Sequence, residues 1–499
     1  MLVQHGVRHL LWADGHTNVQ QNDQVPLLDI HYPFPTLPTQ NPSPTIDLTP
    51  VQTTVSVSAG QVVTIGSLDR SIRLHHIELT VRPPTTARAQ STDQMWFDVA
   101  HVNSSAVNTS AAVSAAAAVS AAKNPHSPLP STGKTKQLSS TDKTKPLPTP
   151  EAARRFQLPF FRQGNVYQRT LIRQLIASDQ LIAIYGDPAN SQHTEAAKAI
   201  QNCGMPSVLH FISQSIGQIT DFDHDGRLAL VLGQLADPLP AESDEQPIRG
   251  CVRPADFQNG SPTSIDAIYL DPIHLKTSEL RSLLAHECAH AAAFSLLVKS
   301  GQSPTEMPSW LNEAIAHLIE QQITPQSENL HQRRLRFQAK PWLYPSVIPK
   351  EFTSIALRRG PSRIASLELL QSTFDSNSNP NLKALIQERG DGINRLLTVN
   401  KTDFPKLFRR FSQHLVQQLC LPASQQNDRP AKTDGIKGAN NTSEQQRFGA
   451  FGLSEFSDQS IQVRGTSVAI SSPATLDCQL VITTTRDALP QITVIDATQ

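Results

Sequence analysis

The chain has 499 residues, which is enough for two to four compact units. Its 43 basic and 43 acidic residues give a formal net charge of zero, so no overall field draws it to nucleic acid or to an anionic membrane, and we expect no nucleic-acid partner. No run of about 18 apolar residues occurs, which predicts that the chain has no transmembrane segment.

The N-terminal third is predicted to contain one β module between two irregular segments. Residues 1–44 are expected to be flexible, and their start, MLVQHGVRHLLWADGH, lacks the apolar core of a secretory signal. Thr, Val and Ile alternate with polar residues over 45–83, which predicts the strands of a small β module spanning 45–102. Residues 103–151 are rich in Ser, Ala, Thr, Pro and Lys, a composition typical of a disordered linker.

A globular domain is predicted over residues 152–324. Its apolar runs predict buried strands, and other segments have the spacing of amphipathic helices. The predicted strands are DQLIAIYGD (179–187), RLALVLGQL (227–235) and DAIYLDP (266–272), and the predicted helices cover 195–203, 206–219, about 278–300 and about 309–322. Mixed strands followed by paired helices indicate an α+β fold.

An acidic turn, DFDHDG, precedes the second predicted strand. Asp221, Asp223 and Asp225 take positions 1, 3 and 5 of a calcium-binding loop, with Gly226 at position 6. Position 12 is Leu232, so the usual bidentate glutamate is absent. Either a carboxylate from elsewhere completes a Ca²⁺ site, or the segment is a tight turn that enters the strand.

The predicted helix at about 278–300 carries polar residues on an otherwise apolar surface, LLAHECAHAAAF. His286 and His290 are four residues apart, so their imidazoles project from the same side of the helix, one turn apart. Two imidazoles at this spacing can hold one metal ion, and Glu287 can reach a water on that ion. The alternative is a helix with two hydrogen-bonded core histidines and a surface glutamate.

The next predicted helix, within PSWLNEAIAHLIE (308–320), has its own polar stripe. Glu313, His317 and Glu320 are four and then three residues apart and share one side of an apolar cylinder. A catalytic zinc takes three protein ligands and keeps one position open for water, and Glu313 supplies the missing third ligand. The alternative is that this stripe is only the solvent-facing side of an amphipathic helix.

Beyond this pair of helices, the chain is predicted to be mainly helical over 325–421, where amphipathic stretches such as FPKLFRRFSQHLVQQL occur. A second linker is expected at 422–450, which is rich in Gln, Asn, Lys and Gly. Alternating Val, Ile and Thr near the C-terminus predict a terminal β module at 451–499.

The pair HECAH and WLNEAIAH resembles the gluzincin branch of zinc metallopeptidases, in which H-E-x-x-H is followed by a helix bearing N-E-[GA]-x-[AS]. Within that branch the chain is most similar to hyicolysin-type neutral metallopeptidases, which have an Asp/Gly-rich turn and strand and a strand just before the active helix. The corresponding segments here are FDHDGRLALVLGQL and DAIYLDP. The resemblance covers roughly residues 155–420.

The resemblance implies a zincin-like catalytic domain in which His286, His290 and Glu313 bind Zn²⁺ and Glu287 is the general base. Gluzincins of the thermolysin type have an acid four residues after the ligand glutamate, where it orients a ligand histidine. In this chain that position is His317, so Glu320 or an aspartate elsewhere would take the orienting role. No motif identifies a donor to the transition state, for which His331, Tyr344 and His414 are candidates.

These features predict a zinc-dependent endopeptidase that acts on a protein or peptide substrate, with a helical C-terminal extension and flanking β modules. The strand near Ala267–Leu270 is expected to be an edge strand that pairs with an extended substrate. The alternative is a catalytically inactive zincin-like protein that serves in binding or surface attachment.

Two features of the sequence predict different locations for the protein. Modules on tethers rich in Ser, Thr and Pro favour a secreted or cell-envelope protein, whereas the missing signal favours the cytoplasm. The sequence does not determine the oligomeric state.

Overall fold

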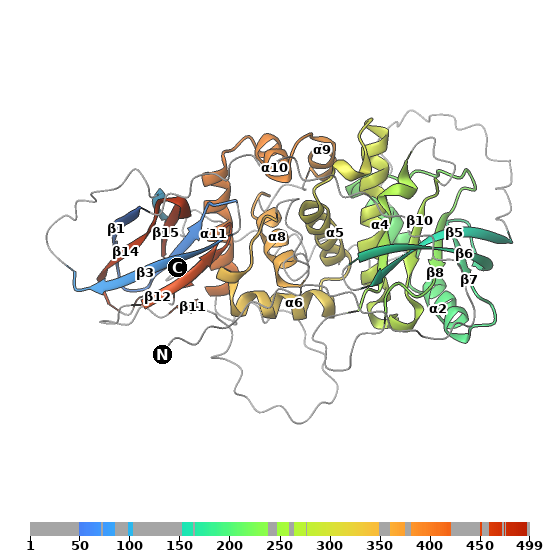
Figure 1. The fold of residues 1–499 in the computed structure, drawn as a ribbon, viewed down its shortest axis with the longest axis horizontal. Coiled ribbons are helices and arrows are strands. Elements are labelled where there is room, and N and C mark those ends of the chain that lie inside the picture. Colours follow the sequence, from blue (N-terminus) through green and yellow to red (C-terminus); the bar gives the residue numbers. More distant parts are fainter. Residues whose placement is uncertain are drawn as a thin grey trace, which may run out of the picture.

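The computed structural model describes most of the chain outside the predicted linkers. The described residues are 49–70, 73–84, 98–102, 152–162, 165–237, 247–258, 264–275, 277–348, 360–374, 381–420, 450–451, 459–471, 474 and 476–496. The predicted flexible segment at 1–44 and the predicted linkers at 103–151 and 422–450 lie outside this set, apart from residue 450. Helices and strands both occur, which confirms the predicted α+β class. Figure 1 shows a β-sandwich at one end, helices in the middle and a six-stranded sheet at the other end.

The six-stranded sheet has the order β5-β6-β7-β8-β10-β9. Its strands are β5 (Ala153–Arg162), β6 (Asn165–Ser178), β7 (Ile182–Gly186), β8 (Leu228–Leu232), β9 (Gly250–Val252) and β10 (Ala267–Leu270). The sequences IAIYG, LALVL and AIYL of β7, β8 and β10 are buried throughout, as expected for parallel strands covered on both faces. These three central strands lie within the segments predicted from their apolar runs.

The prediction of an edge strand at Ala267–Leu270 is wrong. β10 pairs with β8 on one side and antiparallel with β9 on the other, where Leu270 lies opposite Gly250. Among the described residues, the outer strand at this end of the sheet is therefore β9. Its three residues are too few to show a hydrophobic period, so the sequence pattern did not reveal it.

One face of the sheet is covered by α2 (Ser191–Asn202), α3 (Met205–Ser215) and α4 (Thr277–Lys299). α4 is buried along most of its length, because nearly all of its side chains from Leu284 to Ser295 are inside. The other face has its own buried apolar cluster, to which Phe156 and Leu158 of β5 and Tyr185 of β7 belong. α4 therefore lies at the centre of its domain.

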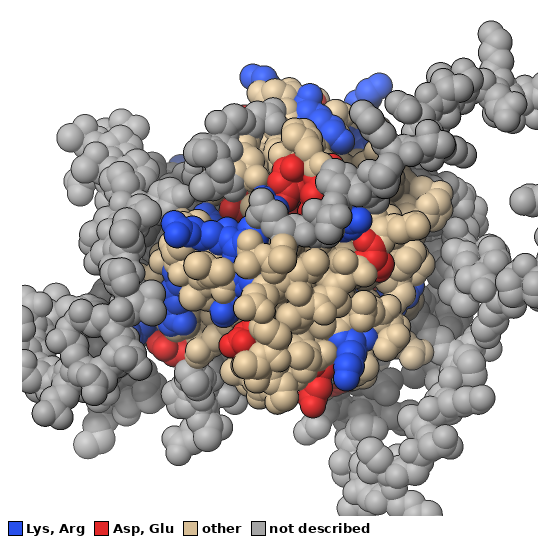
Figure 2. Space-filling view, turned by 90° about the vertical axis from the view of Figure 1, so that its right-hand side faces the viewer, with Lys and Arg blue, Asp and Glu red and all other residues tan. Residues whose placement is uncertain are grey.

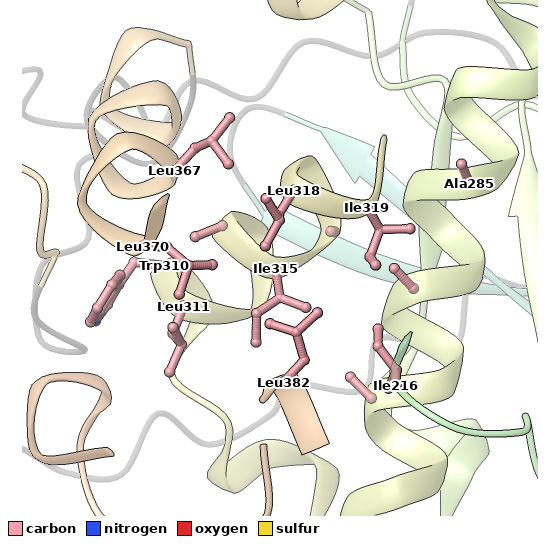
Figure 3. Close-up of a cluster of buried hydrophobic side chains, with 14 of the residues drawn as sticks. Ile216, Ala285, Trp310, Leu311, Ile315, Leu318, Ile319, Leu367, Leu370 and Leu382 are labelled. Atoms are coloured by element: carbon pink, nitrogen blue, oxygen red, sulfur yellow. The ribbon is translucent and has the colours of Figure 1, made fainter. Parts of the chain in front are cut away.

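The middle of the molecule contains α5 (Ser309–Ile323), α6 (Glu328–Ala339), α8 (Pro361–Gln371), α9 (Leu382–Gln387), α10 (Gly392–Asn400) and α11 (Phe404–Cys420). Figure 3 shows the apolar side chains of α5 reaching toward α8, α9 and α4. Trp310 of α5 lies so close to Gly392 that a Cβ there would approach its ring to 2.4 Å, so this glycine permits the contact. The helical region shares one continuous core with the α4 face of the sheet.

The two predicted β modules form a single β-sandwich. The N-terminal segment contributes β1 (Pro50–Val57), β2 (Gln61–Ser67), β3 (Leu74–Arg82) and β4 (Asp98–Val102), and the C-terminal segment contributes β11 (Ala450–Phe451), β12 (Gln459–Arg464), β13 (Val468–Ser471), β14 (Cys478–Thr485) and β15 (Pro490–Asp496). The sheets are β1-β14-β3-β12 and β11-β13-β2-β15-β4, so both contain strands from both segments. The prediction of two separate modules is therefore wrong. The alternation of apolar and polar residues identifies a strand, but it does not identify the strand with which it pairs.

The sandwich packs against α11 of the helical region. A Cβ at Gly66 of β2 would lie 2.5 Å from the ring of Phe408, so the backbone and the ring are in close contact. Gln491 of β15 donates a hydrogen bond to the carbonyl oxygen of Pro405 at 2.8 Å. Short 3-10 helices complete the described structure at Pro254–Phe257, Pro272–His274, Pro304–Glu306, Pro341–Leu343 and Arg486–Ala488.

The surface agrees with the balanced composition. On the face drawn in Figure 2, basic and acidic side chains are interspersed on a mostly uncharged surface. Among the described helices, none combines the length and the apolar character needed to cross a membrane.

Candidate metal centre

The two histidines of α4 lie side by side in the interior. His286 and His290 are buried, and their Nε2 atoms are 3.1 Å apart. This follows from the four-residue spacing on a helix, which stacks the two side chains one turn apart. The predicted pair is thus brought together with both Nε2 atoms directed to one place.

α5 packs along α4 and brings Glu313 to the same place. The Oε2 atom of Glu313 lies 3.5 Å from Nε2 of His286. Burial alone would raise the pKa of Glu313, but Arg363 and His286 hold that pKa well below its ordinary value. Glu313 is therefore a carboxylate beside an imidazole nitrogen, as a metal ligand must be.

His317 belongs to the same cluster. One ligand atom each from His286, Glu313 and His317 lies within 4.8 Å of the others, so this group could hold a metal ion. The predicted trio had His290 in place of His317. The group whose ligand atoms all lie within 4.8 Å of one another contains His317 and not His290, and His290 contacts this group through His286. The two helices therefore offer a larger donor set than the motif alone indicated.

A buried hydrogen-bond network around Glu320 supports both histidines. His317 Nδ1 lies 2.9 Å and His286 Nδ1 3.3 Å from Glu320 Oε2, and the His286 contact lacks hydrogen-bond alignment. Ser282 and Ser327 donate to Oε1 at 2.6 and 2.7 Å. Glu320 thus lies where it can orient His286. The sequence predicts this role for Glu320 or for an aspartate elsewhere, and the contact favours Glu320.

The network also fixes the state of the His317 ring. Burial would raise the pKa of Glu320, but the contacts with His286 and His317 hold it well below its ordinary value, so Glu320 is an acceptor. Burial and the neighbouring His286 lower the pKa of His317 to about 3, so this ring is neutral. Nδ1 then carries the proton, and Nε2 keeps a lone pair that is buried without a hydrogen-bond partner among the described residues.

Glu287 lies beside the histidines with an unsatisfied oxygen. Glu287 is only 4% exposed, and its Oε2 atom has no hydrogen-bond partner within the described part of the chain. Burial raises its pKa to about 7, although His286 acts in the opposite direction. A buried carboxylate oxygen without a partner is costly, so Glu287 does not stabilise the packing around it.

β9 passes directly over Glu287. A Cβ added at Gly250 would lie 2.9 Å from Oε1 and 3.0 Å from Cγ of Glu287. Glycine is therefore required for the strand to approach the carboxylate this closely. The contact also places the outer strand of the sheet next to the histidine pair.

Arg363 is a site residue that sequence reasoning missed. It lies in the first turn of α8, with Nη1 2.8 Å from Oε2 of Glu313. It stands fifty residues after Glu313 and belongs to no recognised motif, so only the packing of α8 on α5 reveals it.

The three candidate transition-state donors lie elsewhere. His414 pairs with Glu368 at 2.8 Å, and Tyr344 packs against Phe337. His331 is exposed on α6. None of the three has a recorded contact with Glu287 or Glu313 among the described residues.

The acidic turn brings its three aspartates together. One carboxylate oxygen each of Asp221, Asp223 and Asp225 lies within 4.8 Å of the others. The buried Asp266 faces them, and burial together with Asp223 raises its pKa to about 8. Arg154, however, already forms an ion pair with Asp223. The turn therefore has the three carboxylates that a calcium site needs, but one of them already pairs with the guanidinium of Arg154. The calcium site stays a prediction.

Comparison with known proteins identifies no family. No protein-family model matches the chain, and a search of curated proteins finds no match. The resemblance of the two motifs to gluzincins therefore stays a prediction.

Proposed function

We propose that this protein is a zinc-dependent endopeptidase. The observation that carries the proposal is that Nε2 of His286 lies 3.1 Å from Nε2 of His290 and 3.5 Å from Oε2 of Glu313, next in sequence to Glu287, a buried carboxylate with an unsatisfied oxygen. A general base must lie within reach of the water that it deprotonates, and that water needs an activating group next to it. In this proposal Glu287 is the base, and a zinc ion held by α4 and α5 would be the activating group.

The donor set suits zinc. Two imidazoles and one carboxylate are a common set of protein ligands in catalytic zinc sites. Burial would lower the pKa of His286, but Glu313 and Glu320 raise it to about 10, so a metal ion that binds there would displace a proton from this ring. Burial and His286 lower the pKa of His290 to about 4, so its ring is neutral and can donate a lone pair. When bound, zinc would act as a Lewis acid toward the scissile carbonyl and the attacking water.

The residues of the chain supply the proton transfers. Glu287 takes a proton from water as the water oxygen bonds to the carbonyl carbon. The same proton passes to the peptide nitrogen as the carbon–nitrogen bond breaks, leaving a carboxyl group and an amine. Glu320, held by Ser282 and Ser327, keeps the ring of His286 oriented throughout.

An extended peptide would pair with β9, which replaces the strand first expected in that role. Among the described strands β9 is the outer one, and it contacts Glu287 through Gly250, so a peptide that adds to it would run close to the proposed base. Main-chain hydrogen bonds of this kind are independent of side-chain identity, which suits an endopeptidase.

The close approach of Gly250 gives a specific prediction. Gly250→Ala should lower turnover by about tenfold or more while zinc stays bound, because the new Cβ must push the Glu287 carboxylate out of position. The measurement is kcat per bound zinc. Gly233→Ala is the matched control, since its Cβ would crowd Leu158 at 2.8 Å on another part of the sheet. Equal losses in the two variants would show that crowding alone is responsible.

The function is tested by metal removal. Casein hydrolysis by the purified chain should stop when a zinc chelator is added and should return with added zinc, and elemental analysis should find about one tightly bound zinc per chain. Hydrolysis that persists in the zinc-free protein contradicts the proposal. A zinc-loaded protein that cleaves no peptide favours the alternative of a non-catalytic binding or attachment protein.

A further inference from the structure

The acidic turn before β8 has the backbone of a cation-binding loop. Gly226, at position 6, has a φ of 77°, and its N–H donates a hydrogen bond to Oδ2 of Asp221 at 3.0 Å. One carboxylate oxygen each of Asp221, Asp223 and Asp225 lies within 4.8 Å of the others. Acidic side chains also gather in turns that bind no ion, so the partners of each oxygen decide what this turn can hold.

Two of the three aspartates use one oxygen for the fold and leave the other one buried. Oδ2 of Asp221 accepts the N–H of Gly226, and Oδ2 of Asp223 forms the ion pair with Arg154. The Oδ1 atom of each aspartate is buried and has no hydrogen-bond partner in the part of the chain that the structure describes. The side chain of Asp223 is only 9% exposed. Such an oxygen is unfavourable unless a donor or a cation satisfies it.

A third buried oxygen faces the same turn from β7. Tyr185 is 0% exposed, and its phenol oxygen has no hydrogen-bond partner among the described residues. Burial raises the pKa of this phenol, Arg154 lowers it, and Asp225 and Asp223 raise it, so these charged groups lie near its oxygen. Because Tyr185 belongs to a strand and not to the turn, its unsatisfied oxygen is evidence independent of the acidic sequence.

The ion pair with Arg154 does not balance the charge of the turn. One guanidinium contacts one carboxylate, whereas three carboxylates come within 4.8 Å of one another, which leaves an excess of negative charge. The cluster offers oxygen atoms only, and these suit hard cations such as Ca²⁺ and Mg²⁺ better than zinc. Ca²⁺ accepts irregular sets of carboxylates and waters, whereas Mg²⁺ requires a nearly ideal octahedron. A turn without the usual glutamate at position 12 therefore favours Ca²⁺.

We propose that Asp221, Asp223 and Asp225 bind one Ca²⁺ ion beside the buried phenol of Tyr185. The ion satisfies the buried carboxylate oxygens and neutralises the charge that Arg154 leaves. The site is separate from the histidine pair of α4, and the inference does not depend on the proposed endopeptidase function.

The turn is held by several parts of the domain. The N–H of Phe222 donates to the buried Asp266, just before β10, at 3.1 Å. The N–H of Thr220 donates to the hydroxyl of Ser295 in α4 at 2.9 Å, and the ring of Phe222 packs edge-on against Phe257. An ion that binds the native turn but not the unfolded chain therefore stabilises the domain as a whole.

Calcium binding is tested on the full-length chain as purified, after dialysis into calcium-free buffer. Calorimetry should find about one Ca²⁺ per chain, with a Kd between about 10⁻⁷ and 10⁻³ M, the range of sensor and extracellular calcium loops. At a Ca²⁺ concentration about 100 times the Kd, the melting temperature should rise by a few degrees. Mg²⁺ at the same concentration should raise it much less. Zinc content should be the same before and after the titration.

Two variants locate the ion. Asp221→Asn and Asp223→Asn should each weaken calcium binding by about tenfold or more, since the affinity of such loops depends on the number of charged ligands. Asp179→Asn is the matched control, because Asp179 lies in the turn before β7 and accepts the N–H groups of Leu181 and Ile182 at 2.7 and 2.9 Å, outside the cluster. It should leave the calcium affinity unchanged.

Arg154→Met distinguishes a calcium site from a turn that needs only its own guanidinium. Removal of a neighbouring positive charge should strengthen calcium binding by about tenfold or more. The variant should melt below the wild type in calcium-free buffer, because Asp223 loses its counter-ion, and added Ca²⁺ should restore most of the difference.

Four results would overturn the inference. The first is no binding heat and no change in melting temperature at millimolar Ca²⁺. The second is unchanged calcium binding in both Asp221→Asn and Asp223→Asn, which would place the ion elsewhere. The third is an equal response to Mg²⁺, and the fourth is an Arg154→Met variant that calcium neither binds more tightly nor stabilises. None of these results bears on the endopeptidase proposal, which zinc removal and casein hydrolysis test separately.

Discussion

Replacing Glu287 with glutamine should lower peptide turnover by about 10²-fold or more, because positioned acid–base groups contribute about 10²–10⁴ to the rate. Glutamine keeps the shape of the side chain and can still contact Gly250, but it cannot accept a proton from water. Zinc content should stay near one per chain, since Glu287 is not a proposed ligand. The loss should therefore fall on kcat.

The same variant separates catalysis from packing. Burial raises the pKa of Glu287 to about 7, which means that its charged form is disfavoured where it lies. Removing that charge should leave the melting temperature nearly unchanged or should raise it. Zinc content, melting temperature and peptide hydrolysis are best measured on one purified sample. Activity within a few-fold of wild type would exclude Glu287 as the general base, even with zinc present.

The part of the site that the sequence predicts well is the part fixed by helix periodicity. His286 and His290 lie together because residues four apart on a helix must do so, and HECAH makes that helix recognisable. α4 and α5 begin and end within one or two residues of their predicted limits, because the helical spacing of their apolar residues is regular. The contact of Glu313 with His286 follows from packing these two helices against each other.

The features that the sequence could not predict depend on contacts distant in the chain. Arg363 reaches Glu313 only because α8 packs on α5, and no local pattern encodes that contact. β9 has three residues, too few to show a hydrophobic period, so the sequence wrongly predicts β10 as the outer strand. The sandwich joins strands separated by about four hundred residues, as in the pairing of Thr54 with Val481, and alternation contains no information about such partners.

Two residues of α5 could complete the proposed zinc site. Glu313 and His317 share one side of the helix, and both lie within reach of His286. Glu320 Oε2 lies 2.9 Å from His317 Nδ1, which makes His317 part of the supporting network, but its Nε2 keeps a buried lone pair. Glu313 has its Oε2 atom 3.5 Å from His286 Nε2, the nitrogen that faces His290. We therefore favour Glu313 as the third ligand.

Glu313→Ala should abolish zinc binding, whereas His317→Ala should weaken it by about 10- to 100-fold, the usual effect of losing a group that supports a ligand. Glu313→Ala also leaves Arg363 facing the site without the carboxylate that neutralises it, which adds repulsion toward a cation. His290→Ala is the reference for loss of a ligand, and it should also lower the melting temperature, since bound zinc ties α4 to α5. Zinc affinity is measured by competition with a chelator of known strength. If His317→Ala abolishes binding and Glu313→Ala only weakens it, the site is a three-histidine one, and Glu313 serves instead to hold Arg363.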